Sequence, residues 1–160
     1  MRTIAALAFL GILLSVAAGT AVSMQRAGTK SIDDAVLAVS AEMTKAGEAA
    51  DADALFSYIL ENDKGSVIQN GVFFATRQEA LERVRENLRP GNRRIHYQWN
   101  RQYVTVLSPE VALLTAEGTV AATGVSGETV MTPLAQTIVF VRKGGNWKVL
   151  HAHQSTSIAR

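Results

Sequence analysis

The chain has 160 residues, with 16 Lys and Arg against 14 Asp and Glu, and no cysteine. This length favours a single domain, and a formal net charge of +2 gives no general reason to expect a nucleic acid or an anionic membrane as a partner. The lack of cysteine excludes disulfide bonds, cysteine nucleophiles and zinc sites with thiolate ligands.

The N-terminus is typical of a secretory signal peptide. Arg2 supplies a positive charge, residues 4–16 are mostly apolar, and residues 17–23 are mostly small. The apolar run is shorter than the roughly 20 residues that a membrane-spanning helix needs, which favours cleavage over anchoring. We therefore expect residues 1–23 to be removed. The product would be periplasmic or secreted, with no stable membrane association after cleavage.

Residues 24–30 are polar or small, and we expect them to form a flexible leader before a domain at residues 31–157. Ser31 is typical of a helix N-cap, because its hydroxyl can accept a hydrogen bond from a backbone N–H of the first turn. Apolar residues then recur at helical spacing: Ile32, Val36, Val39, Met43 and Ala46. The first helix is therefore predicted to begin at Ser31.

Two more helices and a hairpin are predicted next. Asp51 is a second N-cap candidate, in front of a short apolar helix. An Asn-Gly pair at 70–71 separates two apolar runs, which is typical of a tight β-hairpin. Thr76 and Glu79 have the spacing of a capping box, and the helix that they open is expected to stop at Pro90-Gly91.

The rest of the chain is rich in β-branched residues and predicts strands. Four runs are separated by turn residues: 95–107, 111–123, 129–141 and 147–155. Helices followed by antiparallel strands predict an α+β fold. In such a fold the helices cover one face of the sheet and leave the other for solvent or a partner subunit.

The final hairpin and the order of elements resemble the NTF2-like superfamily, in its SnoaL-like and DUF4440 branch. The local likeness is to the association domain of calcium/calmodulin-dependent kinase II. It is carried by Gly145-Asn146-Trp147, by Leu150-His151-Ala152-His153-Gln154-Ser155 and by Ile95-His96, within residues 32–157. The resemblance implies a cone in which three N-terminal helices pack in a strongly curved, mainly antiparallel sheet. It also implies a pocket at the open end and dimers formed by sheet faces.

One departure from that family bears on the pocket. The kinase domain carries pocket arginines at the positions of Ile138 and Gln154, and neither residue is basic here. The resemblance therefore implies a neutral or apolar pocket in this chain. Relatives of this fold include isomerases, dehydratases and hydrolases as well as binding and oligomerisation modules, so fold alone does not give the function.

Strand alternation gives candidate ligand-binding residues. Gln136 and Ile138 share one face of their strand, and Leu150 and Gln154 share one face of the next. With Tyr58 near the mouth, they are expected to line the pocket. Two amides on an apolar wall suit a small, mostly apolar, neutral molecule. The alternative, that the glutamines only cap backbone groups at the mouth, stays open.

Catalysis would need a proton-transfer group inside the cone, and the candidates are Glu117, Tyr58 and Tyr97. Glu117 interrupts an apolar run, so a desolvated carboxylate there would have a raised pKa and could act as a general base. Alternatively, Glu117 faces outward. Alternation cannot decide, because a slip of one residue reverses every face. The orientation of Glu117 thus separates an enzyme from a binding or oligomerisation module.

His151 and His153 lie two residues apart and are expected on one strand face. They could bind a metal with His96, but no carboxylate stands at ligand spacing beside them, so we expect no metal and no cofactor. Trp147 and Val149 have the same parity, and together these four residues predict a homodimer interface on that face.

Arginines surround two aromatic residues in the first long strand, a pattern that can bind single-stranded nucleic acid. They are Arg89, Arg93, Arg94 and Arg101, around Tyr97 and Trp99. The exported address instead favours a solvated rim, and we expect no nucleic-acid partner.

Overall fold

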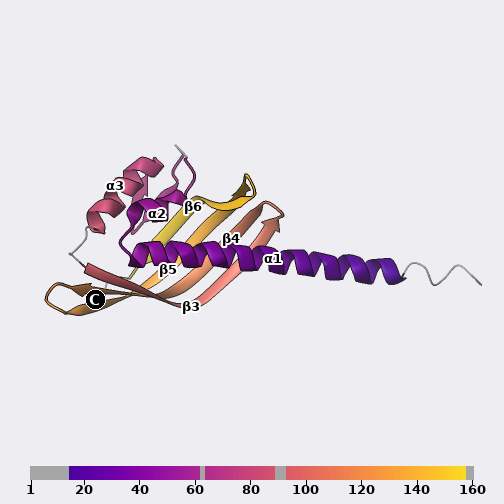
Figure 1. Cartoon of the computed structure of the whole chain (residues 1–160), viewed down its shortest axis with the longest axis horizontal. Helices are drawn as coiled ribbons and strands as arrows, with labels where there is room; N and C mark the ends of the chain where they lie inside the picture. The colour runs from indigo at the N-terminus through magenta and orange to yellow at the C-terminus, as the bar shows by residue number, and fades with distance from the viewer. Residues whose placement is uncertain (1–14, 62–63, 89–92, 158–160) are drawn as a thin grey trace, which may run out of the picture.

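The computed structural model describes residues 15–61, 64–88 and 93–157 and confirms the predicted α+β fold (Figure 1). Three helices and six strands occur among these residues. In chain order they are α1 (Ser15–Glu48), α2 (Ala52–Ser57), β1 (Val67–Gln69), β2 (Val72–Phe74), α3 (Arg77–Asn87), β3 (Arg93–Ser108), β4 (Val111–Gly124), β5 (Thr129–Lys143) and β6 (Asn146–Thr156).

The six strands form one curved, open sheet in the order β2-β1-β6-β5-β4-β3. All neighbouring strands are antiparallel except β1 and β6, which are parallel. Helix α1 crosses the concave side of the sheet, and α2 and α3 lie beside it (Figure 1). The helices and the concave face together form the expected cone.

The core lies between the helices and the concave face. Its largest fully buried apolar side chains come from every layer of the cone: Val36, Phe56, Leu114, Phe140 and Val149. Burial of each such side chain stabilises the fold by about 1.5–3 kcal/mol relative to an exposed position. The core therefore holds the helices against the sheet.

Polar side chains spaced four residues apart on α1 also bind β3. Because residues at i and i+4 lie on one helix face, the three groups form a stripe along the contact. The bonds run from Gln102 Nε2 to Ser40 Oγ (3.2 Å), from Trp99 Nε1 to Thr44 Oγ1 (3.1 Å), and from the Tyr97 backbone N–H to Glu48 Oε1 (2.8 Å). They fix the register of α1 on β3 where apolar contacts alone would allow sliding.

The local signals in the sequence correctly placed two helix starts and the hairpin. The Asp51 side chain accepts from the Ala54 backbone N–H at 2.8 Å, and Thr76 opens α3 with a complete capping box. Asn70 and Gly71 have φ angles of 51° and 81°, which a type I′ hairpin turn requires. The expected stop of α3 at Pro90-Gly91 lies outside the described residues.

Helix α1 begins earlier than predicted. It includes residues 24–30, which were expected to form a flexible leader, and runs through Ser31, which was expected to be its N-cap. The segment before Ser31 contains helix-forming Ala, Met, Gln and Arg, and the single Gly28 costs only about 1 kcal/mol relative to alanine. A good N-cap residue does not start a helix when the preceding residues also favour one.

No helix within residues 15–61, 64–88 and 93–157 is both long and apolar enough to cross a membrane. The greater part of the expected signal peptide, residues 1–14, lies outside the described residues.

Two strands interrupt their alternation. The pairing of β3 with β4 skips Asn100 and Leu107, and the pairing of β5 with β6 skips Leu150. Each extra residue is a β-bulge, which bends the strand and moves the following side chains to the opposite face. The bulges add to the curvature of the sheet.

The bulge at Leu150 corrects two predictions. Leu150 is 37% exposed and does not point into the cone. Trp147 and Val149 lie in the buried core on the concave side, with Val149 0% exposed, so they do not share an outer face with His151 and His153. The predicted dimer face was therefore wrong in those two residues.

Gly118 is paired with Trp99, next to the bulge at Asn100 in β3. A Cβ atom there would lie 2.2 Å from the Gln98 backbone oxygen, so Gly118→Ala must displace the backbone of β3. We expect the free energy of unfolding to fall by about 1–3 kcal/mol, measured by urea denaturation. Gly124→Ala on the same strand is the control. Its Cβ would meet nothing within 3.7 Å, and it should change stability little. Equal stabilities of the two variants would contradict the prediction.

Candidate functional site

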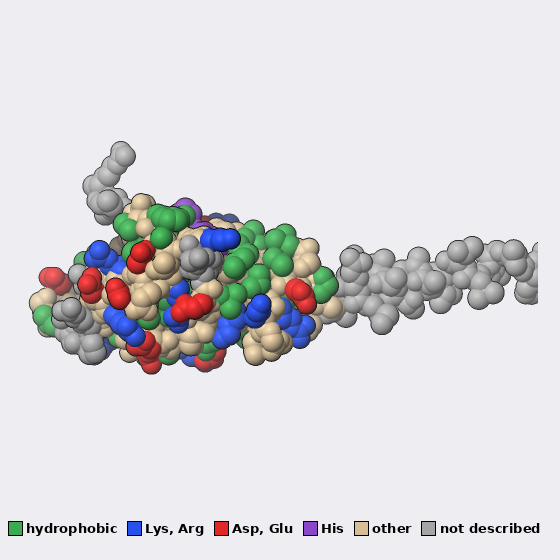
Figure 2. Space-filling view, turned by 90° about the horizontal axis from the view of Figure 1, so that it is seen from above, with side chains coloured by type: hydrophobic (Ala, Val, Ile, Leu, Met, Phe, Trp, Pro, Cys, Tyr) green, Lys and Arg blue, Asp and Glu red, His purple; other side chains and the backbone are tan. Residues whose placement is uncertain are grey.

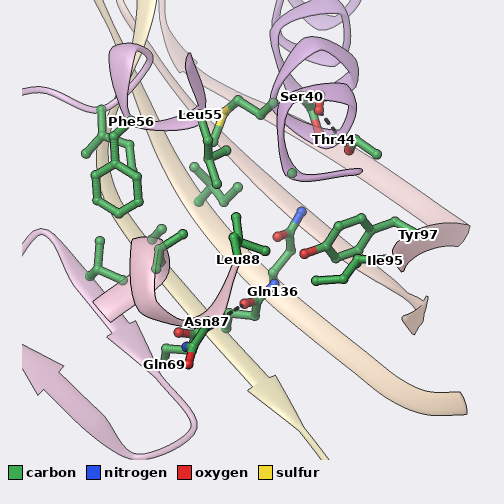
Figure 3. A pocket seen from close by; sticks show the side chains of 18 of the residues that line it. Ser40, Thr44, Leu55, Phe56, Gln69, Asn87, Leu88, Ile95, Tyr97 and Gln136 are labelled. Atoms are coloured by element: carbon green, nitrogen blue, oxygen red, sulfur yellow. Dashed lines mark hydrogen bonds between the residues drawn. The ribbon is translucent and has the colours of Figure 1, made fainter. Parts of the chain in front are cut away.

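A cavity of about 220 Å³ lies between the helices and the concave face of the sheet (Figure 3). Most of its wall on the side of the helices and the residues that follow them is apolar, from Met43, Leu55, Phe56, Ile59, Val84 and Leu88. None of the described residues that line it carries a formal charge. A dry apolar cavity of about 150 Å³ accommodates benzene. The space here therefore suits a molecule of one or two rings.

Amide side chains gather at one end of this cavity (Figure 3). Gln69 of β1, Gln154 of β6 and Gln136 of β5 are register partners in sequence, so they form a row across three strands of the concave face. Gln69 Nε2 donates to Gln154 Oε1 at 2.8 Å. Asn87, from the last turn of α3, adds a fourth amide.

Gln136 is half-buried and makes no hydrogen bond to another of the described side chains or backbone groups. In Figure 3 its amide points into the cavity, toward the same space as the ring of Tyr97. A carboxamide offers two N–H donors and a carbonyl oxygen with two lone pairs. The Gln136 side chain is thus available for a ligand or for water.

Tyr97 forms a second polar element of the wall. Its ring lies against the α1 backbone, since a Cβ at Gly47 would be 3.3 Å from Tyr97 Cε2, and it stacks on Trp99 with 5.9 Å between ring centroids. Burial raises the pKa of the Tyr97 phenol, and the Glu48 carboxylate raises it further. The phenol therefore stays protonated at neutral pH and can donate a hydrogen bond.

Glu117 lies outside the cavity, so the sequence-based candidate for a general base is not in the cone. Its carboxylate points from the convex face of β4, where it binds the Arg101 guanidinium at 2.7 Å, and its side chain is 49% exposed. Tyr58 caps α2 and lies under the Lys148 ammonium group, and it is not among the cavity residues.

The structure places Gln136, Ile138, Gln154 and Tyr97 in the cavity wall, but not Leu150. Whether they bind a ligand stays a prediction. Sequence analysis missed Gln69 and Asn87, because neither stands in a local motif. The position of Gln69 depends on the long-range parallel pairing of β1 with β6.

The three histidines do not form a metal site. His151 Nδ1 lies 2.9 Å from the Gly65 carbonyl oxygen, while His96, on β3 at the far side of the sheet, binds Glu48 at 2.8 Å. No cluster of three or more His, Asp or Glu side chains suited to a metal occurs in the described part of the chain.

The arginines and aromatic residues of β3 also separate. Tyr97 and Trp99 line the cavity, whereas Arg94 is exposed and Arg101 pairs with Glu117 on the convex face. Arg89 and the Arg93 side chain lie outside the described residues. On the face shown in Figure 2, Lys and Arg are interspersed with Asp and Glu. On that face the described residues do not form the continuous basic surface that binds single strands, and the absence of a nucleic-acid partner stays a prediction.

The solved structures that share this fold include three with informative descriptions. A proposed dehydratase of the NTF2-like family from Streptomyces avermitilis has a TM-score of 0.71 and 21% identity, covering 82% of this chain and 99% of that one. A proposed calcium/calmodulin-dependent protein kinase II association domain from Xanthomonas campestris has a TM-score of 0.68 and 16% identity, and the match covers 78% of this chain and 87% of that one. A proposed scytalone dehydratase from Novosphingobium aromaticivorans has a TM-score of 0.69 and 10% identity, and the match covers 78% of this chain and 83% of that one.

At these identities the likeness shows the fold alone. No curated protein matches the chain. The SnoaL-like domain family, however, matches residues 36–159, which span α1 from the core residue Val36 through the end of β6. The protein therefore belongs to the SnoaL-like family and has the NTF2-like fold.

Proposed function

We propose that this protein is an exported, dimeric binding module that holds a small, mostly apolar, neutral molecule in its cone. The observation that carries the proposal is the chemistry of the cavity wall. It combines apolar side chains with four amides and one phenol, and none of its described residues carries a formal charge. A ligand with a formal charge would lose its hydration there without gaining a counter-ion.

An enzyme of the same fold is the alternative, and two of the structural relatives carry the name of a proposed dehydratase. General acid–base catalysis needs a group that exchanges a proton near neutral pH within reach of the substrate. Among the described cavity residues, only Tyr97 titrates, and its surroundings move its pKa away from neutrality. The wall therefore supports binding over proton transfer.

Filling the cavity should abolish binding. Ala152 lines the wall, so Ala152→Met places a longer side chain in the space that the ligand would take. We expect the affinity for coumarin, a neutral bicyclic probe, to fall at least about tenfold by isothermal titration calorimetry. Ala135→Met makes the same change on the exposed convex face and should leave the affinity unaltered. Equal binding by the two variants would place the probe elsewhere.

The convex face supports the dimer. The three described helices lie on the concave side of the sheet (Figure 1), and the residues of the convex face form cross-strand rows of mostly uncharged side chains. One row comprises Tyr103, Thr115, Thr137 and His153, and the next comprises Thr105, Leu113, Val139 and His151. The neighbouring charges, Arg101 and Glu117, neutralise one another. A broad face of this kind suits a self-complementary interface around a twofold axis.

A charge at the centre of this face should separate the subunits. Thr137 is exposed and lies on the central strand β5, so Thr137→Glu would bring like charges together across the axis without disturbing the core. We expect monomers by sedimentation velocity, whereas Ala41→Glu on the exposed side of α1 should leave dimers. A wild-type protein that sediments as a monomer at roughly tens of micromolar, well above a micromolar dissociation constant, would refute the dimer.

Export remains based on the sequence of the N-terminus. Cleavage after Gly19, Ala21 or Ser23 fits the small residues that follow the apolar run. Mass spectrometry of the protein from its native host should therefore find a mature N-terminus between residues 20 and 24. Recovery of intact Met1 on membrane-bound protein would show an anchor instead.

A further inference from the structure

We infer that the ligand carries a cis-amide edge, in which an N–H donor stands beside a C=O acceptor, as in a lactam, a cyclic imide or a 2-pyridone ring. This inference rests on the proposed function, namely that the cone binds a neutral small molecule. It follows from the hydrogen-bonding groups that the glutamine row (Gln69, Gln154 and Gln136) leaves available.

The pair of Gln69 and Gln154 always leaves one donor group and one acceptor group. As placed, Gln69 donates to Gln154 at 2.8 Å, which leaves the Gln154 NH₂ and the Gln69 carbonyl for another partner. If the oxygen and nitrogen of both amides are exchanged, Gln154 donates to Gln69, and the Gln69 NH₂ and the Gln154 carbonyl remain for another partner. The requirement for a partner that both donates and accepts thus does not depend on how the amides are oriented.

Gln136 adds a third amide in register with Gln154, and it has no partner among the described residues. A half-buried carboxamide without a partner among the described residues loses part of its hydration, so a ligand that both donates to it and accepts from it restores the missing hydrogen bonds. A carboxamide is best satisfied by another amide edge, through two parallel hydrogen bonds, because donor then faces acceptor twice.

Other neutral groups match this row less well. A ketone, ester or ether only accepts, so the glutamine carbonyls would stay unmet. An aliphatic hydroxyl both donates and accepts, but it does so through a single oxygen atom, so it cannot form two parallel hydrogen bonds with one carboxamide edge. A carboxylate brings a charge to a wall whose described residues offer no cation.

The rest of the cavity determines the polarity and size of the part of the ligand that lies beyond its amide edge. Leu55 and Phe56 lie across the cavity from Gln69 and Asn87 (Figure 3). A ligand that places its amide edge on the glutamine row therefore directs its remainder toward apolar side chains. The volume of about 220 Å³ limits that remainder to roughly one further ring or a short alkyl chain.

Three bicyclic molecules of one size test the inference. They are 2-quinolinone, which has the cis-amide edge, coumarin, which replaces its N–H by an ether oxygen, and naphthalene, which has neither group. We expect the wild-type protein to bind 2-quinolinone about tenfold more tightly than coumarin, with naphthalene weakest, by isothermal titration calorimetry.

Substitutions of glutamine residues test whether the preference for 2-quinolinone over coumarin comes from the glutamine row. Gln136→Leu keeps the size of the side chain and removes the amide, so the preference for 2-quinolinone over coumarin should fall to within about twofold while naphthalene binds at least as well. Gln98→Leu, on an exposed position of β3, should keep the full preference. Gln69→Leu gives a second measurement on the same row if Gln136→Leu fails to fold.

The outcomes separate this inference from the proposed function. Equal affinities for the three molecules, or tighter binding of coumarin, would overturn the amide edge and leave a neutral, apolar cavity in place. If none of the three binds the wild-type protein, the proposed function fails and the amide edge fails with it. A tenfold preference that Gln136→Leu does not reduce would assign the recognition to other groups and overturn the role of the row.

Discussion

The curvature of the sheet is the constraint on which the cavity depends. A regular sheet of this length would present one set of alternating side chains to the helices along its whole length. The bulges at Asn100 and Leu150 instead change which residues face inward, so Trp147 and Val149 serve the core while Ala152 and Gln154 serve the cavity. One strand thereby supplies both a packed region and an open one.

The polar stripe on α1 has a matching role at the other side of the cone. Ser40 and Thr44 each bind a side chain of β3, and both also line the cavity. Their hydrogen bonds satisfy polar groups that would otherwise be costly in a largely apolar space. The Glu48 carboxylate holds the backbone of Tyr97, so the same contact that docks the helix also positions the phenol.

Local structure was readable from the sequence because its causes are local. The capping box at Thr76, the Asn-Gly turn and the alternation of the long strands involve neighbours in the chain, and the structure has all three. The predicted start of α1 was wrong because Ser31 is a good N-cap residue, whereas the residues before it also have a high helix propensity and continue the helix. Alternation placed Gln136 and Gln154 correctly but failed at Leu150, since no local signal marks the bulge.

The amide row shows why a site is harder to read than a fold. Its three glutamines stand in strands whose pairing is parallel in one case and antiparallel in the other, and only that pairing brings them into line. The sequence suggested Glu117 as a general base and Arg101 as part of a basic surface, but the two side chains form an ion pair on the convex face. A wall of uncharged groups discriminates by unmet hydrogen bonds and by desolvation. The selectivity that we propose for this cone therefore rests on the pattern of donors and acceptors that the sheet assembles.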